Sequence, residues 1–197
     1  MGNTEDFVRE YTEHDSSPCK EIIEWFESNQ SLHTPGVVAI GDSRNQVDNN
    51  EKESTDICLP LRLAYQVPPI AKMMDVLWKS VNSYIEEFDV LQGTCFTMLE
   101  NINIQKYTPP SGGYKAWHTE RIGATSVTRM LVWMIYLNTV TDKGGTEFMY
   151  IKKTTNAEEG KIVLWPPDFT HLHRGIPSPT QEKYIMTGWY NFTLPQS

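Results

Sequence analysis

The stretch GKIVLWPPDFTHLHRGIPSPTQEKYIMTGWYNF (160–192) decides the fold, because it holds three short runs of β-branched and aromatic residues separated by turn-forming residues. We expect strands at 161–165, 170–175 and 183–193. The preceding residues repeat this pattern, with apolar runs divided by paired prolines and paired glycines. They predict strands at 95–107, 114–119, 129–138 and 146–151. Short strands at this spacing favour a double-stranded β-helix, or jelly roll.

Before residue 94 the sequence has a helical character instead. Ser17-Pro18 is a good helix start, and it predicts a helix over 18–29. Apolar residues from Ile70 to Phe88 recur at three- and four-residue steps and predict a helix over 69–89. Such a stripe is a packing surface, so we assign these residues no chemistry.

Between the two helices, 33–40 ends in an apolar run that favours a strand, and 41–57 is almost wholly polar and is predicted to be a long loop. The expected architecture is mainly β with flanking α-helices, in a single domain over 1–197. A helical support region at 1–93, with the loop 41–57, would pack on a jelly-roll core at 94–197 that carries the site.

Composition excludes several classes of function. The net charge of −8 disfavours contact with phosphate backbones, so we expect no nucleic-acid partner. No apolar run approaches the roughly 20 residues that span a bilayer, and the acidic N-terminal stretch predicts neither a signal nor a transit peptide. The three cysteines are odd in number and widely spaced, which favours reduced thiols and a cytoplasmic protein.

Two histidines and a carboxylate are the candidate metal ligands. His118 and Glu120 stand two apart, so on a strand both side chains leave the same face. This pattern alone is also that of a half-exposed edge strand. A third ligand must come from elsewhere, and His173 is the best candidate, with His171 as a neighbouring or substrate-facing residue. A facial set of two histidines and one carboxylate suits Fe(II) and leaves coordination positions open.

A candidate cation lies ten residues beyond His173. Lys183 opens a strand on which Ile185, Thr187 and Trp189 share its face. Burying a lysine on such a face is costly without an anion, and a cosubstrate carboxylate would supply one. Arg174 is the second choice for this anion-binding role, and a solvent-exposed Lys183 at the strand end remains the alternative.

Three segments resemble the iron(II)- and 2-oxoglutarate-dependent dioxygenases, and especially their prolyl 4-hydroxylase-like branch. They are KYTPPSGGYKAWHTE (106–120), LVWMIYLNTVTDKGGTEF (131–148) and 160–192. The resemblance implies that His118, Glu120 and His173 bind Fe(II), with Glu120 in place of the aspartate that most of the family uses. It further implies that Lys183, Tyr107 and Tyr136 bind the carboxylates of the cosubstrate 2-oxoglutarate.

The activity that the resemblance implies is dioxygen-dependent hydroxylation of an unactivated C–H bond, with release of succinate and CO2. The expected target is a peptidyl proline or a related amino-acid side chain. The same cofactors acting on a free small molecule, by hydroxylation, desaturation or cyclisation, are the alternative within enzymes. A non-catalytic metal-binding jelly roll is the alternative outside them. The candidate residues for the substrate side are Trp117, Arg121, Trp165, His171 and Trp189.

Overall fold

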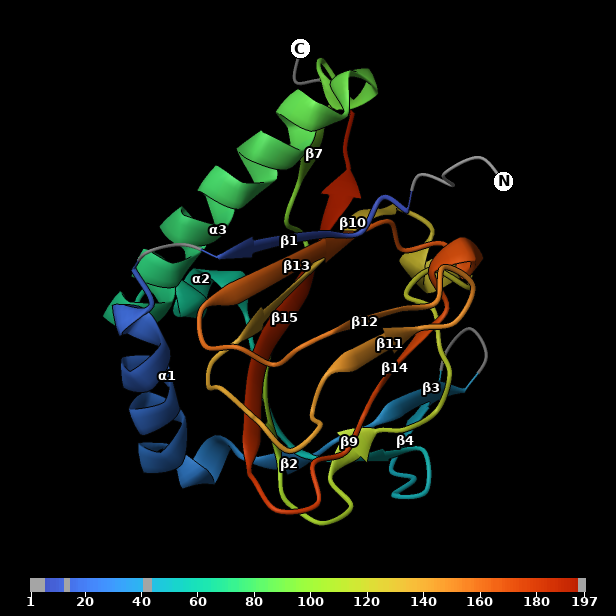
Figure 1. The fold of residues 1–197 in the computed structure, drawn as a ribbon. Helices are drawn as coiled ribbons and strands as arrows, with labels where there is room; N and C mark the ends of the chain where they lie inside the picture. The colour runs from blue at the N-terminus through green and yellow to red at the C-terminus, as the bar shows by residue number, and fades with distance from the viewer. Residues whose placement is uncertain (1–5, 13–14, 41–43, 195–197) are drawn as a thin grey trace.

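The computed structural model describes residues 6–12, 15–40 and 44–194, and in them an eight-stranded antiparallel sheet dominates (Figure 1). Seven strands follow one another in hydrogen-bonded order, and β7 (Phe96–Thr97) pairs separately with β15. In sheet order the seven are β1 (Arg9–Thr12), β13 (Lys161–Trp165), β10 (Arg129–Tyr136), β15 (Lys183–Phe192), β8 (Ile102–Tyr107), β6 (Thr55–Leu59) and β2 (Thr34–Pro35).

The described residues also form three smaller sheets. They are β12 (Lys153–Thr155) with β11 (Thr146–Phe148) and β14 (His173–Gly175), β3 (Val38–Ile40) with β4 (Arg44–Gln46), and β5 (Lys52–Glu53) with β9 (Gly113–Tyr114). Phe148 of β11 belongs to the same buried cluster as Val132 and Met134 of β10. The predicted jelly roll of two opposed sheets is therefore confirmed.

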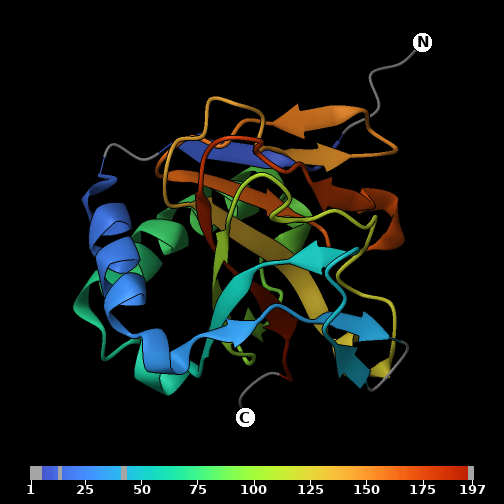
Figure 2. The same ribbon diagram turned by 90° about the horizontal axis from the view of Figure 1, so that it is seen from below.

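The helices cover the other face of the large sheet. They are α1 (Ser17–Ser28), α2 (Leu61–Ala64) and α3 (Pro68–Glu87), with short 3-10 turns η1 (Gln30–Leu32), η2 (Asp89–Leu91), η3 (Ala124–Ser126) and η4 (Phe169–His171). Both long helices begin at proline, whose missing N–H costs nothing in a first turn. This confirms the two predicted helices. Seen from below in Figure 2, α1 lies at one side of the molecule and β3 and β4 lie at the opposite side.

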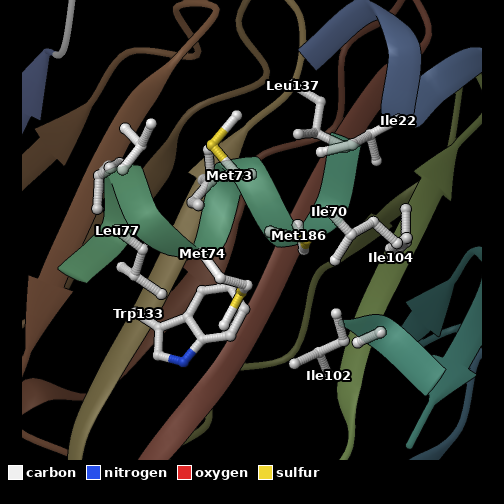
Figure 3. Close-up of a cluster of buried hydrophobic side chains, with 14 of the residues drawn as sticks. Ile22, Ile70, Met73, Met74, Leu77, Ile102, Ile104, Trp133, Leu137 and Met186 are labelled. Atoms are coloured by element: carbon white, nitrogen blue, oxygen red, sulfur yellow. The ribbon is translucent and has the colours of Figure 1, made fainter. Parts of the chain in front are cut away.

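Alternation along the central strands separates a packing face from a functional face. On β10, Leu131, Trp133 and Ile135 join the cluster under α1 and α3, whereas Val132 and Met134 point the other way. Figure 3 shows α3 side chains lying over Trp133. Gly188 is the cross-strand partner of Trp133, and a Cβ there would lie 2.6 Å from the indole ring. The glycine therefore makes room for the largest side chain of the core.

The predicted long loop at 41–57 is wrong for the residues that the structure describes, and 41–43 lie outside them. β4, β5 and the start of β6 occupy this stretch and pair with β3, β9 and β8. Backbone pairing forms these strands despite their polar side chains. Two of those side chains can be buried because Lys52 Nζ and Asp56 Oδ2 form an ion pair at 2.7 Å. Polar residues that indicate a loop in the sequence therefore include two, Lys52 and Asp56, that form a buried ion pair.

The predicted strand at 170–175 is also partly wrong. Its first residues form the turn η4, in which the His171 N–H donates to the Asp168 carbonyl, and only β14 is a strand.

Within the described ranges, no helix has both the length and the apolar character needed to cross a membrane.

Candidate active site

His118, Glu120 and His173 meet at one point. An isolated antiparallel bridge joins the two histidines, and their backbone N–H and carbonyl groups exchange hydrogen bonds of 2.9 Å in both directions. The Nε2 atoms of His118 and His173 lie 3.6 and 3.4 Å from Glu120 Oε1. One ligand atom from each of the three residues lies within 4.8 Å of the other two. This spacing suits a single metal ion.

Backbone carbonyls orient both imidazoles. His118 Nδ1 lies 2.9 Å from the Ala116 carbonyl oxygen, and His173 Nδ1 lies 2.8 Å from that of His171. A carbonyl only accepts hydrogen bonds, so Nδ1 carries the proton in each ring and the lone pair of Nε2 faces Glu120. This is the tautomer that a metal site requires.

The charges of the three residues favour a cation. Burial alone raises the pKa of Glu120, but the neighbouring His118 and His173 hold this pKa well below its usual range. Burial and the His118 imidazole lower the pKa of His173. Near neutral pH the site is therefore an ionised carboxylate beside an uncharged His173 imidazole, which is the form that binds a divalent metal.

The three residues lie on the wall of a cavity of about 750 Å³. The lining also contains Lys183 with its strand neighbours Ile185 and Thr187, all from the functional face of β15. Residues from β2 and β6 and from the segment that joins them line the cavity as well, and they include Thr34, Pro35, Val37, Val47, Lys52, Asp56 and Cys58. Of these, Thr34, Pro35, Val37 and Val47 are exposed and form the outer part of the cavity, whereas Lys52 and Asp56 are buried.

Lys183 is 3% exposed, and its ammonium group has only carbonyl partners. Nζ donates to the Gly144 carbonyl at 2.8 Å and to that of Ile176 at 3.5 Å, and it lies 4.9 Å from the Tyr107 ring centroid. Burial lowers the pKa of Lys183 to about 8. Within the described part of the chain, no carboxylate forms an ion pair with it. A buried cation without an anion points to an anionic ligand.

Of the two tyrosines predicted to bind the cosubstrate, one lines the cavity and the other does not. Tyr107 lines the cavity and donates its hydroxyl to Gln105 Oε1 at 2.8 Å. Tyr136 is buried outside the lining, where its hydroxyl bonds to the hydroxyls of Thr146 and Thr155 at 2.8 Å each. Thr146 is itself part of the lining, so the Tyr136 hydroxyl lies one residue behind the cavity wall and contacts that wall through Thr146.

Arg174 also lies away from the cavity. Its guanidinium pairs with Glu147 at 2.9 Å and stacks on the Trp117 ring at 4.4 Å. Because β-strand alternation sends Arg174 to the face opposite His173, the structure contradicts its prediction as the anion-binding cation. Lys183 is thus the one of the two that reaches the cavity.

Among the predicted substrate-side residues, the structure brings Trp165 and Trp189 into the lining but not the other three. Trp117 stacks under Arg174, and Arg121 donates to the Asp168 carboxylate. His171 is buried, with Nε2 3.1 Å from the Asp6 carbonyl oxygen and Nδ1 2.9 Å from the Thr170 hydroxyl. It does not share the face of His173, because η4 replaces the expected strand.

Sequence reasoning missed two polar groups in the lining. One is Lys52, Asp56 and Gln105, in which Gln105 Nε2 donates to Asp56 Oδ2 at 3.2 Å. The other is Arg129 with Glu100, whose guanidinium and carboxylate form hydrogen bonds of 2.9 and 2.6 Å. For Gln105, alternation with Tyr107 on β8 was the available signal. Lys52 and Asp56 are only four residues apart, but they lie in a stretch whose composition indicates a loop, and Arg129 and Glu100 are distant from each other in the sequence.

Comparison with known proteins agrees with this geometry. Residues 102–191, which contain His118, Glu120, His173 and Lys183, match the family described as 2OG-Fe(II) oxygenase superfamily. These residues belong to that superfamily. The protein is accordingly a 2-oxoglutarate-dependent oxygenase, with Fe(II), 2-oxoglutarate and dioxygen as its cofactors and cosubstrates. No protein of curated function matches the sequence.

Solved structures of prolyl hydroxylases share the fold of this oxygenase. A Trichoplax adhaerens prolyl hydroxylase, in complex with a peptide fragment of the hypoxia inducible factor oxygen degradation domain, has a TM-score of 0.73 and 15% identity over 95% of this chain and 84% of that one. A Pseudomonas putida prolyl-4-hydroxylase gives 0.69 and 14%, over 94% and 93%. A collagen prolyl hydroxylase of Paramecium Bursaria Chlorella virus-1 gives 0.63 and 14%, over 95% and 97%. At these identities the likeness establishes the fold.

The residues present fit the cofactors of the superfamily. Two unprotonated imidazole nitrogens and one carboxylate oxygen form the facial donor set that non-haem Fe(II) oxygenases use. The unpaired ammonium group of Lys183, in the same cavity, suits the distal carboxylate of 2-oxoglutarate. Glu120 therefore fits this donor set although it is one methylene longer than aspartate.

Proposed function

We propose that this oxygenase hydroxylates an unactivated C–H bond of a peptidyl proline or a related amino-acid side chain, releasing succinate and CO2. The observation that carries the proposal is that one cavity holds both the His118, Glu120 and His173 cluster and the unpaired Lys183. Membership of the superfamily supports dioxygenase chemistry. The shared fold of the prolyl hydroxylases supports the choice of target.

In this proposal each residue has a separate task. His118, Glu120 and His173 hold Fe(II) through Nε2, Oε1 and Nε2, and the backbone bonds at Nδ1 keep the two rings in place. Fe(II), with bound 2-oxoglutarate and dioxygen, supplies the oxidising power for C–H hydroxylation. Lys183 binds the distal carboxylate of the cosubstrate, which orients the molecule along the functional face of β15.

Tyr107 supports the same carboxylate from the neighbouring strand. In the register of β8 and β15, Tyr107 stands directly opposite Lys183, and both line the cavity. The hydroxyl of Tyr107 donates to Gln105 and can instead donate to an incoming carboxylate oxygen. Two donors from paired strands thus define the position of the cosubstrate.

The outer part of the cavity is where the target side chain would enter. Thr34 and Pro35 form β2 at the edge of the large sheet, and Val37 and Val47 are 40% and 52% exposed beside it. An open apolar rim next to a sheet edge suits an extended peptide that places one side chain inside. The Trichoplax adhaerens enzyme is likewise in complex with a peptide.

The decisive experiment measures 2-oxoglutarate turnover by the whole chain. Fe(II) and 2-oxoglutarate, added without oxygen, should give a weak visible charge-transfer band. On admission of oxygen, proline-containing peptides should stimulate succinate release and gain one oxygen atom by mass spectrometry. Free amino acids and other small metabolites, tested in parallel, should give no comparable stimulation.

Variants of the histidines test the assignment of the ligands. His118→Ala and His173→Ala should abolish succinate formation, whereas His171→Ala should keep Fe(II) binding because only its backbone carbonyl contacts His173. A metal-loaded protein without the charge-transfer band would contradict the cosubstrate assignment. Stimulation by free amino acids alone would move the proposal to small-molecule oxidation. Binding of Fe(II) without any succinate would indicate a non-catalytic module.

A further inference from the structure

The two oxygen atoms of the Glu120 carboxylate have different surroundings. Oε1 faces Nε2 of His118 and of His173. Oε2 instead accepts a hydrogen bond of 3.0 Å from the indole Nε1 of Trp189 and one of 3.4 Å from Arg129 Nη1. Two hydrogen-bond donors therefore engage Oε2, whereas Oε1 has no such donor among the described residues and is positioned for a metal.

Arg129 is itself rigidly fixed. Its Nη1 also donates to the Glu120 carbonyl oxygen at 2.7 Å, so it holds both the backbone and the side chain of that residue. Its Nε and Nη2 form a bidentate pair with Glu100, and its guanidinium stacks on the Trp189 ring at 3.7 Å. Asn191, the strand partner of Arg129, donates to Glu100 as well. The support thus rests on the paired strands β10 and β15.

This arrangement addresses the extra methylene of glutamate. A longer side chain has one more rotatable bond, and a free carboxylate can bind a metal through one or through both of its oxygens. Binding through both would use a coordination position that 2-oxoglutarate or dioxygen needs. Hydrogen bonds to Oε2 oppose that mode, because the oxygen would have to give up two donors in a buried site.

We infer that Trp189 and Arg129 are positioning residues that hold Glu120 as a one-oxygen metal ligand. The inference rests on the proposed function, since it assumes that Glu120 binds the metal. Trp189 contributes the N–H donor from the functional face of β15, and Arg129 contributes a charged donor from β10. Neither residue needs to contact the metal.

The test compares Trp189→Phe with wild type in the complete chain, using Co(II) as a redox-stable probe. Phenylalanine keeps an aromatic ring but removes the N–H. We expect Co(II) affinity to fall by about tenfold or more, as for other residues that orient metal ligands. The visible Co(II) spectrum, which reports coordination geometry, should also change at saturating metal. Wild-type affinity with an unchanged spectrum would overturn the inference.

Trp165→Phe is the matched control. Trp165 lines the same cavity and packs edge-on against His173 at 5.1 Å, but its buried indole nitrogen has no hydrogen-bond partner. The same substitution there removes ring volume without removing a hydrogen bond to Glu120. We expect the visible Co(II) spectrum of this variant to match that of wild type. An equal spectral change in both variants would mean that cavity volume, not the N–H donor, matters.

A double-mutant cycle shows whether Trp189 acts through Glu120. In a Glu120→Asp background the shorter side chain withdraws from the indole, so Trp189→Phe should then change Co(II) affinity by no more than about twofold. The same loss in both backgrounds, together with a lower melting temperature, would show a purely structural role and overturn the inference. Absence of Co(II) binding by wild type would instead overturn the proposed metal site, and the inference with it.

Discussion

Two buried lysines line the same cavity, and they differ in what they contact. Lys52 is 4% exposed and pairs with Asp56 Oδ2 at 2.7 Å. Lys183 is 3% exposed, and its ammonium group donates only to the carbonyls of Gly144 and Ile176. Burial is equal in the two places, so the presence or absence of a carboxylate is the whole difference.

The difference separates a structural cation from a ligand-binding one. The charge of Lys52 is balanced within the fold, so this lysine requires nothing from outside. Lys183 is charged at neutral pH although burial lowers its pKa to about 8, and its balancing charge must come from a ligand. The absence of a carboxylate partner beside Lys183, among the described residues, therefore supports the proposal that this lysine binds the cosubstrate.

The largest effect should come from Lys52→Met, compared with Lys183→Met in the cofactor-free protein. Without Lys52, Asp56 is left buried with Oδ1 already unpartnered, so the free energy of unfolding should fall by about 3–5 kcal/mol. Lys183→Met removes a cation that burial disfavours, so the free energy of unfolding should stay the same or rise. Denaturant titration measures both, and an equal loss in the two variants would break the comparison.

The next effect concerns cosubstrate binding. Lys183→Met should lower the affinity for 2-oxoglutarate by about 100-fold or more, because a buried carboxylate of the cosubstrate would lose its charged partner. Fe(II) affinity should stay near that of wild type, since Lys183 lies at the strand position opposite Tyr107 and not beside the histidines. Anaerobic titration with each component measures the two affinities separately. Unchanged 2-oxoglutarate affinity would remove the distinction between the two lysines.

Raising the pH should have a smaller effect on the same binding step. Below about pH 8 the free protein carries charged Lys183, and above it the amine is neutral and must take up a proton to pair with the carboxylate. The affinity for 2-oxoglutarate should then fall by up to about tenfold per pH unit. Lys183→Arg keeps its charge throughout this range, so it should show no such decline if it still binds.

The contribution of Lys183 to the free energy of unfolding of the cofactor-free protein should increase over the same range of pH, whereas the affinity for 2-oxoglutarate should decrease. The unfolded chain binds this proton up to about pH 10.5, whereas the folded chain releases it near 8. The cofactor-free wild type should therefore gain stability relative to Lys183→Met as the pH rises from 8 toward 10.5. A flat difference would show that the folded-state pKa of Lys183 is not lowered.

The smallest effect distinguishes the two tyrosines. Tyr107→Phe should raise the KM for 2-oxoglutarate by about fivefold, the value of one ordinary hydrogen bond. Tyr136→Phe should leave that KM unchanged and lower stability by about 1 kcal/mol, because its hydroxyl serves Thr146 and Thr155. Steady-state kinetics and thermal unfolding of the two variants check this pair. A large KM effect of Tyr136→Phe would show that its hydroxyl turns toward the cosubstrate.

Much of the fold and part of the site follow from the sequence because they depend on local periodicity. The alternation of β15 places Lys183, Ile185 and Thr187 on one face. His118 and Glu120 reach the same cavity for a different reason: the predicted strand at 114–119 is wrong beyond Tyr114, and the isolated bridge from His118 to His173 brings this segment into the site. Within 160–192, β13, β14 and β15 pair with other strands and not with one another, but the apolar runs of β13 and β15 are enough to locate these two strands. The helices α1 and α3 are likewise evident from their apolar stripes.

The remainder depends on pairings between distant segments. Lys52 and Asp56 look like loop residues until β6 pairs with β8 and brings Gln105 against them. Arg174 and Tyr136 seem suited to bind an anion until their partners, Glu147 and the two threonines, are known. Hydrogen-bond partners that are far apart in the sequence leave no periodic signal.

The orientation of the two imidazoles proposed to bind the metal has a consequence for how this protein tolerates change. Both Nδ1 atoms bond to main-chain carbonyls, at positions 116 and 171, and not to side chains. Every amino acid brings a carbonyl, so a substitution at Ala116 keeps the acceptor, whereas one at the buried His171 keeps it but also removes the hydrogen bonds of the His171 ring. The Glu120 carboxylate differs, because its orientation depends on the side chains of Trp189 and Arg129, which a substitution would remove. Relatives of this enzyme should therefore vary more at position 116 than at positions 129 and 189.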